Sequence, residues 1–218
     1  MGRAPIAVID LAALRHNLAV ARLAAPERRI MAVIKSNGYG HGLLRVAAAL
    51  EEADAFAVAC VEEAMQIRHG GMSQPIILLE GFHDARELGQ ICKEDFELVI
   101  HHEWQLEAML DFSCNWSGRV WIKIDTGMGR IGFHADQAAA IYERLRATGR
   151  LAMDKIGWMT HLANADDRND NTTNRQIERF EQALKGIPGL RSIANSAGLL
   201  GWPQTHADWV RPGLMLYG

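Results

Sequence analysis

Short apolar runs alternate along this chain with longer stretches in which apolar residues recur at helical spacing. Within residues 61–69, Val61, Ala64 and Ile67 share the segment with charged residues, the pattern of an amphipathic helix. The apolar runs predict eight strands, at residues 30–35, 56–60, 75–80, 97–101, 120–125, 156–161, 192–195 and 209–217, the last of which includes some loop. The stretches between them predict helices at residues 43–53, 61–69, 84–92, 103–111, 136–148, 172–184 and 197–200.

This alternation predicts an α/β protein with parallel strands joined by right-handed crossovers. Eight strands can close a (β/α)8 TIM-like barrel, which leaves no sheet edge. An open doubly wound sheet is the alternative, but no Gly-x-Gly-x-x-Gly turn follows any predicted strand. A strand-like segment at residues 6–11 and a helix at 12–24 precede the barrel. No helix follows the last strand, so either the N-terminal helix covers that gap or the chain is a fragment.

Composition narrows the class of protein. With 218 residues, 49% of them hydrophobic and 22% charged, the chain predicts one large domain over residues 1–218. The net charge of −3 and the scattered basic residues do not indicate a nucleic-acid partner. The apolar runs are too short to cross a membrane, and residues 1–5 do not begin a signal peptide. The well-separated Cys60, Cys92 and Cys114 predict reduced, partly buried thiols in a cytoplasmic protein.

Polar and glycine-rich segments follow the predicted strands. In a barrel of this kind, the active site lies at the C-terminal ends of the strands. The first strand runs into Lys35 and a glycine-broken turn; the plain alternative is a lysine that ends a strand with its ammonium in water. The other such positions are Asn37, Tyr39, Glu80, Gly81, 125–130, His161, Asn164, Asp166, 195–198 and 211–218. Such clustering predicts an active site at this end.

The segments after the seventh and eighth strands predict a phosphate site. Barrels often hold phosphate between these two loops, at backbone N–H groups. Ser196 offers a hydroxyl before a short helix, and Gly213 and Leu214 offer N–H groups from the other side. The alternative is that Ser196 only caps that helix.

Five ordered blocks resemble the alanine racemase family. Residues 34–42, Ile-Lys-Ser-Asn-Gly-Tyr-Gly-His-Gly, resemble its pyridoxal phosphate attachment motif, and residues 123–132 a second signature. His161, the segment 195–197 and the segment 211–218 match further blocks in the same order. The resemblance covers nearly the whole chain. The usual attachment motif has alanines where this chain has Ser36 and Gly38, and these small changes should not disturb the lysine.

The resemblance implies how the cofactor, pyridoxal 5'-phosphate, is held. Lys35 would carry it as an internal aldimine and act as the base on the D-alanine side. Arg211 would face the pyridine nitrogen, with His161 helping to hold it. The phosphate would lie at Tyr39, Ser196, Gly213 and Leu214. The full implied cofactor site comprises Lys35, Tyr39, His161, Asn195, Ser196, Arg211, Gly213, Leu214 and Tyr217.

The resemblance also implies a substrate site for alanine. Arg130 would contact the cofactor's phenolic oxygen and the substrate carboxylate, and Met128 would line the same site. Lys123 matches a lysine that is carbamylated in several members and orients this arginine. The implied activity is interconversion of L-alanine and D-alanine, which provides D-alanine for peptidoglycan or serves alanine catabolism.

The implied chemistry is physically coherent. Removing the α-proton of an amino acid leaves a carbanion, which pyridoxal phosphate stabilises. An arginine at the ring nitrogen stays protonated and accepts no proton from it, which makes the ring a weaker electron sink and limits transamination. Racemisation also needs two acid–base groups, one on each face of the substrate.

The chain departs from the family pattern after the barrel. Family members carry a C-terminal β-domain that supplies a catalytic tyrosine across a head-to-tail homodimer, and nothing here matches that domain. None of the three tyrosines, Tyr39, Tyr142 and Tyr217, matches this base. We therefore expect a barrel domain that binds the cofactor but racemises poorly or not at all alone.

Two other functions remain open at this point. A single-domain pyridoxal phosphate carrier of cofactor homeostasis would be a barrel of about this size and would need no second base. Lys123 and Arg130 argue against it, because a carrier needs no substrate clamp. A barrel for another phosphate-bearing ligand would make Lys35 dispensable for binding.

Overall fold

Eight parallel strands close into a ring in the computed structural model, which describes residues 6–114 and 116–218. In ring order they are β1 (Arg29–Val33), β2 (Ala55–Val58), β3 (Ile76–Leu78), β4 (Glu97–Ile100), β5 (Val120–Asp125), β7 (Ile156–Met159), β8 (Leu190–Ser192) and β9 (Trp209–Val210). Pairing of β9 with β1, at Arg29 with Trp209 and Ile30 with Val210, completes the circle. The predicted (β/α)8 barrel is therefore confirmed. A two-residue strand, β6 (Phe133–His134), pairs with β5 outside the ring.

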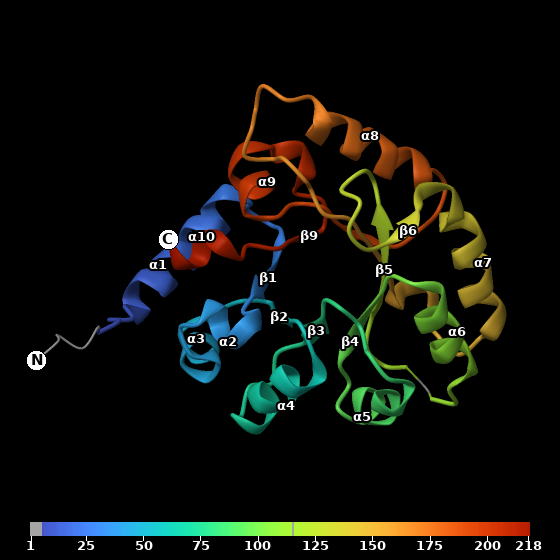
Figure 1. Cartoon of the computed structure of the whole chain (residues 1–218), viewed down its shortest axis with the longest axis horizontal. Coiled ribbons are helices and arrows are strands. Elements are labelled where there is room, and N and C mark those ends of the chain that lie inside the picture. Colours follow the sequence, from blue (N-terminus) through green and yellow to red (C-terminus); the bar gives the residue numbers. More distant parts are fainter. Residues whose placement is uncertain (1–5, 115) are drawn as a thin grey trace, which may run out of the picture.

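Helices surround this ring on its outside (Figure 1). They are α1 (Leu11–Ala24), α3 (Leu43–Ala49), α4 (Val61–His69), α5 (Leu88–Lys93), α6 (Glu103–Asp111), α7 (Ala138–Thr148) and α8 (Thr172–Ala183), with the shorter α2 (Lys35–Tyr39), α9 (Ser196–Gly201) and α10 (Leu214–Tyr217). Helix α1 packs against α3, α9 and α10. The N-terminal helix thus covers the gap that follows the last strand.

Three predicted strand segments are wrong, those at residues 6–11, 192–195 and 209–217; the seventh strand of the ring, β8, already ends at Ser192. Residues 6–10 form no strand, and Leu11 already belongs to α1, because the Asp10 carboxylate caps that helix by accepting the N–H groups of Ala12 (2.8 Å) and Ala13 (3.1 Å). In the predicted strand 209–217 only Trp209–Val210 is extended, and the last four residues form α10. Tyr217 therefore lies on a helix. Residues 1–5, expected not to begin a signal peptide, lie outside the described residues.

The prediction of three reduced cysteines is wrong for two of them. Cys92 in α5 and Cys114 after α6 are joined by a disulfide, while Cys60 is free. The two halves lie 22 residues apart in sequence, and only the packing of α5 beside the segment after α6 brings them together. The described residues contain no cluster of side chains suited to a metal ion.

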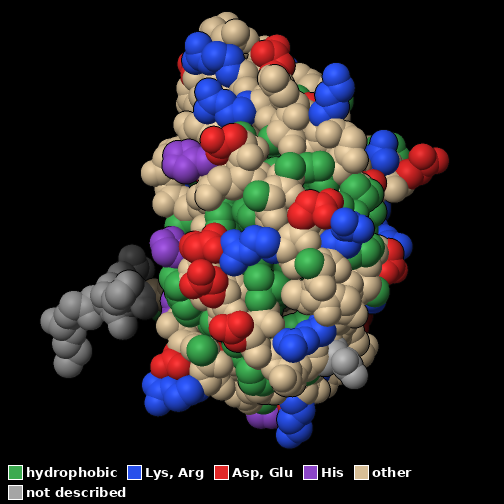
Figure 2. Space-filling view, turned by 90° about the vertical axis from the view of Figure 1, so that its right-hand side faces the viewer, with side chains coloured by type: hydrophobic (Ala, Val, Ile, Leu, Met, Phe, Trp, Pro, Cys, Tyr) green, Lys and Arg blue, Asp and Glu red, His purple; other side chains and the backbone are tan. Residues whose placement is uncertain are grey.

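The surface on the side of α6 and α7 carries acidic and basic side chains interspersed, with small apolar areas between them (Figure 2). Among the described residues, no helix is long and apolar enough to cross a membrane.

The barrel interior is filled by large and small side chains. Its members are Met31, Val33, Ala55, Ala57, Ile77, Val99, Trp121, Met159 and Trp209. Trp121 and Trp209 meet edge to face, with ring centroids 6.3 Å apart. Gly157 in β7 leaves room for the Trp121 ring, because a Cβ there would lie 2.4 Å from a ring carbon. The packing of Trp121 against Trp209 therefore requires glycine at position 157.

We expect Gly157→Ala to destabilise the barrel by about 1–3 kcal/mol, because the fully buried Trp121 ring cannot move away from the added methyl group. The midpoint of urea unfolding measures this. Gly89→Ala is the matched control, since a Cβ there meets no atom closer than 4.0 Å. Equal midpoints for the two variants would contradict this account of the core.

Candidate active site

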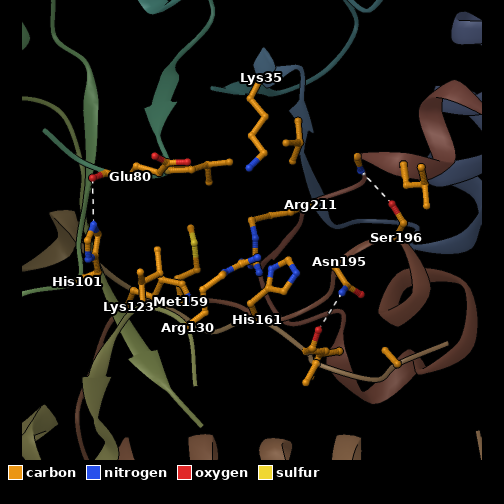
Figure 3. A pocket seen from close by; sticks show the side chains of 18 of the residues that line it. Lys35, Glu80, His101, Lys123, Arg130, Met159, His161, Asn195, Ser196 and Arg211 are labelled. Carbon is orange, nitrogen blue, oxygen red and sulfur yellow. Dashed lines mark hydrogen bonds between the residues drawn. The ribbon is translucent and has the colours of Figure 1, made fainter. Parts of the chain in front are cut away.

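A cavity of about 840 Å³ opens at the C-terminal ends of the strands. It brings together ten of the predicted site residues: Lys35, Tyr39, Lys123, Arg130, His161, Asn195, Ser196, Arg211, Gly213 and Leu214. Figure 3 shows Arg130, His161 and Arg211 converging on one region, with the Lys35 ammonium pointing toward it from the start of α2, just after β1. Met128 and Tyr217 are not among the lining residues.

Lys35 enters the cavity from a left-handed turn. The backbone φ angles of Ser36, Asn37, Gly38 and Tyr39 are 54°, 56°, 62° and 52°, so the glycine-broken turn expected after Lys35 consists of four consecutive left-handed residues. This turn directs the lysine inward and returns the chain so that the Tyr39 ring reaches the exit of β9. A Cβ on Gly38 would meet Val46 at 2.9 Å, so packing as well as φ favours glycine there.

Arg211 is a buried cation, 4% exposed, at the exit of β9. Its guanidinium donates to the Ser192 hydroxyl (2.6 Å) and to the carbonyls of Thr160 (2.5 Å) and Ile193 (3.2 Å). Among the described residues, the ion pairs include no carboxylate for this arginine. Burial, with the nearby charge of Arg130, lowers the pKa of Arg211 to about 9, so it stays a cation at neutral pH.

Lys123 and His161 respond to the same positive field. Burial, Arg211 and Arg130 lower the pKa of Lys123 from 10.5 to about 7, although Asp125 opposes the shift. Burial and the charges of Arg211, Lys123, Arg130 and Lys35 lower the pKa of His161 to about 3. His161 is therefore neutral at physiological pH, and Lys123 holds its proton only in part.

One end of the cavity is built from Tyr39, Ser196 and Gly213. The Ser196 hydroxyl oxygen accepts the N–H groups of Gly213 (3.0 Å) and Met215 (3.2 Å). A Cβ on Gly213 would lie 2.7 Å from the Tyr39 hydroxyl, so only glycine permits this approach. Ser196 thus joins the exits of β8 and β9, while the cap of α9 is Asn195, which accepts from the Gly198 N–H (2.9 Å).

Tyr217 supports this end of the cavity from behind. Its ring stacks on Tyr39, with centroids 4.6 Å apart, and its hydroxyl donates to the Val33 carbonyl (3.2 Å). Burial raises the pKa of Tyr217. The side chain steadies Tyr39 and ties α10 to β1, and its predicted contact with a cofactor stays a prediction.

The loop after β5 presents Arg130. The Asp125 carboxylate accepts the backbone N–H groups of Gly127 (2.8 Å), Met128 (2.9 Å) and Gly129 (2.9 Å), which folds the loop tightly over the strand end. Arg130 then lines the cavity, whereas Met128 takes part only through its backbone.

Several lining residues escaped the sequence analysis, among them His101, Trp104 and Gln105. Gln105, buried in α6, donates to the carbonyls of Glu80 and Phe82 (both 3.0 Å) and accepts the His101 N–H (3.1 Å). The His101 ring donates from Nε2 to the Glu80 carbonyl (3.1 Å). His101 directly follows β4, so the rule that functional residues follow strand ends, which identified Lys35, could also have identified His101. Gln105 lies within a helix, where that rule does not apply.

The lowered pKa of Lys123 has a consequence for stability. Between about pH 7 and 10.5 the unfolded chain holds a proton on this lysine that the folded chain has released. The free energy of unfolding should therefore rise with pH in this window. We expect Lys123→Met to flatten that rise, measured by urea unfolding at a series of pH values. Lys185→Met, at an exposed lysine just after α8, should leave it unchanged, and equal flattening would contradict the assignment.

Comparisons with known proteins point in one direction. The family model described as "Alanine racemase, N-terminal domain" matches residues 9–218. An alanine racemase from Halorhodospira halophila is 51% identical over 219 residues, covering 100% of this chain and 60% of that protein. The biosynthetic alanine racemase from Pseudomonas aeruginosa superposes with a TM-score of 0.92 at 43% identity, covering 96% of this chain and 58% of that one.

A third relative was solved with a bound group. The alanine racemase from Bartonella henselae, crystallised with covalently bound pyridoxal phosphate, superposes with a TM-score of 0.86 at 26% identity, covering 96% of this chain and 59% of that one. The chain thus spans about 60% of the length of the relatives it matches. Since the family model matches nearly all of the sequence, and a relative that is 51% identical covers the whole chain, the chain belongs to the alanine racemase family.

Proposed function

We propose that this chain is the cofactor-binding barrel domain, residues 1–218, of a protein that interconverts L-alanine and D-alanine with pyridoxal 5'-phosphate. The observation that carries the proposal is the convergence of Lys35 and the buried Arg211 on one cavity that ends at Tyr39, Ser196 and Gly213. The cytoplasmic location and the homodimer of the whole protein, expected from the sequence, are part of the same proposal.

The residues of the cavity fit such a cofactor. The close approach of the Tyr39 hydroxyl to Gly213 makes a cradle that a Cβ would fill, suited to a phosphate. Lys35, Lys123, Arg130 and Arg211 bring basic side chains to the same cavity, which favours an anionic ligand. In the described structure Arg211 lacks a carboxylate partner, and its guanidinium is available to a ring nitrogen. In our proposal Lys35 would hold the group covalently, and Arg211 would contact its ring nitrogen.

Each residue then has a task set by its protonation. Pyridoxal phosphate, when bound, supplies the electron-withdrawing ring that stabilises the carbanion of the deprotonated amino acid. The Lys35 amine takes or returns a proton at Nζ on one face of the substrate. Arg211 keeps its proton, since a guanidinium is not readily deprotonated. Arg130 offers a charged, planar donor set to a carboxylate.

The second proton-transfer group comes from elsewhere in this proposal. Tyr142 lies on the outer helix α7, and the Tyr217 hydroxyl is occupied by the Val33 carbonyl. Tyr39 belongs to the phosphate end. We therefore assign the second group to residues outside the described barrel, as the family resemblance implies. A carrier of cofactor homeostasis, which needs no second group, is disfavoured by the family match and by Lys123 and Arg130 in the cavity.

The decisive test is addition of pyridoxal phosphate to the purified protein while its visible absorbance is recorded. We expect a band that requires the Lys35 amine and is lost in Lys35→Ala. Lys185→Ala, which removes an exposed lysine far from the cavity, is the matched control and should keep the band. Pyridoxal phosphate binding of equal strength by Lys35→Ala would contradict the proposal. That result would instead fit a barrel for another phosphate-bearing ligand, which does not need this lysine.

A further inference from the structure

The turn after Lys35 is held in an unfavourable conformation. Ser36, Asn37 and Tyr39 are not glycines, yet all three have positive φ, which brings Cβ close to the following carbonyl. Such a conformation persists only when surrounding contacts hold it in place. The turn also fixes both ends of the proposed cofactor site, because Lys35 begins it and Tyr39 ends it.

A carboxylate from the neighbouring βα unit makes such a contact. Glu63, half-buried in the first turn of α4, accepts the backbone N–H of Asn37 at 2.9 Å through Oε1. Its other oxygen accepts the N–H of Ala59 at 3.1 Å, just after β2. One carboxylate therefore ties the exit of β1 to the exit of β2. Hydrogen bonds to a charged acceptor are among the stronger ones available to a backbone N–H.

The other hydrogen bonds of Asn37 are made within the turn or to the start of the following helix, and at the end of the turn the Tyr39 ring stacks on Tyr217 of α10. The Asn37 side chain accepts the Leu43 N–H at 2.8 Å, and the Gly42 N–H donates to the Asn37 carbonyl at 2.9 Å. These bonds close the turn on itself but do not fix it against the barrel. The Glu63 carboxylate does so at a residue in the middle of the left-handed segment.

Polar side chains tie other strand exits in the same way. Gln105 joins the exits of β3 and β4. Gln176, buried in α8, donates to the Thr126 hydroxyl (3.2 Å) and the His161 carbonyl (3.0 Å), which follow β5 and β7. Glu63 is the member of this series that acts on the lysine's own turn. Because the same kind of tie recurs around the barrel, we infer that these side chains fix the strand exits relative to one another. Stabilising the start of a helix would not require this recurrence.

We propose that Glu63 is a positioning residue, which holds the left-handed turn so that Lys35 and Tyr39 keep the spacing that pyridoxal phosphate requires. This inference rests on the proposed function, since it concerns the same cavity. The competing account is that Glu63 only stabilises the start of α4, as an acidic residue in the first turn of a helix commonly does.

Two variants and one matched control separate these accounts in the intact protein. Glu63→Ala removes both hydrogen bonds, and Glu63→Gln keeps one acceptor oxygen without the charge. Glu62→Ala is the control, because this exposed neighbour lies in the same first turn but contacts the Cys60 thiol. The readouts are amide hydrogen exchange of residues 36–40 without cofactor, the Kd for pyridoxal phosphate, and the thermal unfolding midpoint.

We expect Glu63→Ala to speed exchange at residues 36–40 and to weaken pyridoxal phosphate binding about tenfold, the size expected for a lost charged hydrogen bond. Glu63→Gln should lie between this variant and the wild type, and should decide the question if Glu63→Ala does not fold. Glu62→Ala should change neither exchange at the turn nor Kd. A purely structural role would lower the unfolding midpoint and leave Kd within about twofold.

Three results would overturn the inference: unchanged exchange at residues 36–40 in the Glu63 variants, an unchanged Kd, or an equal loss of affinity in Glu62→Ala. Failure of the proposed function looks different. In that case the wild-type protein itself forms no band that depends on Lys35.

Discussion

The pairing of β9 with β1 is the contact on which the rest of the molecule depends. It closes the ring of parallel strands, so that all strand exits open on one mouth. Lys35 near one end of the sequence and Arg211 near the other then face the same cavity, although they lie 176 positions apart in the sequence. An open sheet of the same strands would hold these side chains at opposite edges. Closure is therefore a condition of the site as well as of the fold.

Closure also concentrates positive charge. The buried guanidinium of Arg211 is tied to two backbone carbonyls and a hydroxyl, and its field reaches Lys123 and His161. This field and the low polarity of the interior favour the neutral forms of both groups. A ligand with negative charge would offset the positive potential that Arg211, Arg130 and Lys35 create in the cavity. The cavity is thus prepared electrostatically for the anionic cofactor that we propose.

Much of the architecture could be predicted from the sequence, because strands and helices depend on local patterns of apolar and polar residues. The apolar runs located the strands, and the rule that function follows strand ends found Lys35, Arg130 and Ser196. The failures have local causes as well. Four apolar residues at 214–217 form a helix because the chain turns at Gly213, and Cys92 meets Cys114 only through packing. Gln105 and Glu63 gave no signal, since a polar residue in an amphipathic helix normally faces water.

By itself, the sequence determined the order of the elements, the strand-end position of Lys35 and the family, because each depends on residue type and spacing along the chain. Only the tertiary structure decided the left-handed turn after Lys35, the lowered pKa of Lys123, the stacking of Tyr217 behind Tyr39 and the ties made by Glu63 and Gln176. These features depend on burial and on contacts between distant segments. A linear pattern does not contain them, because distances across the barrel are set only when the ring closes.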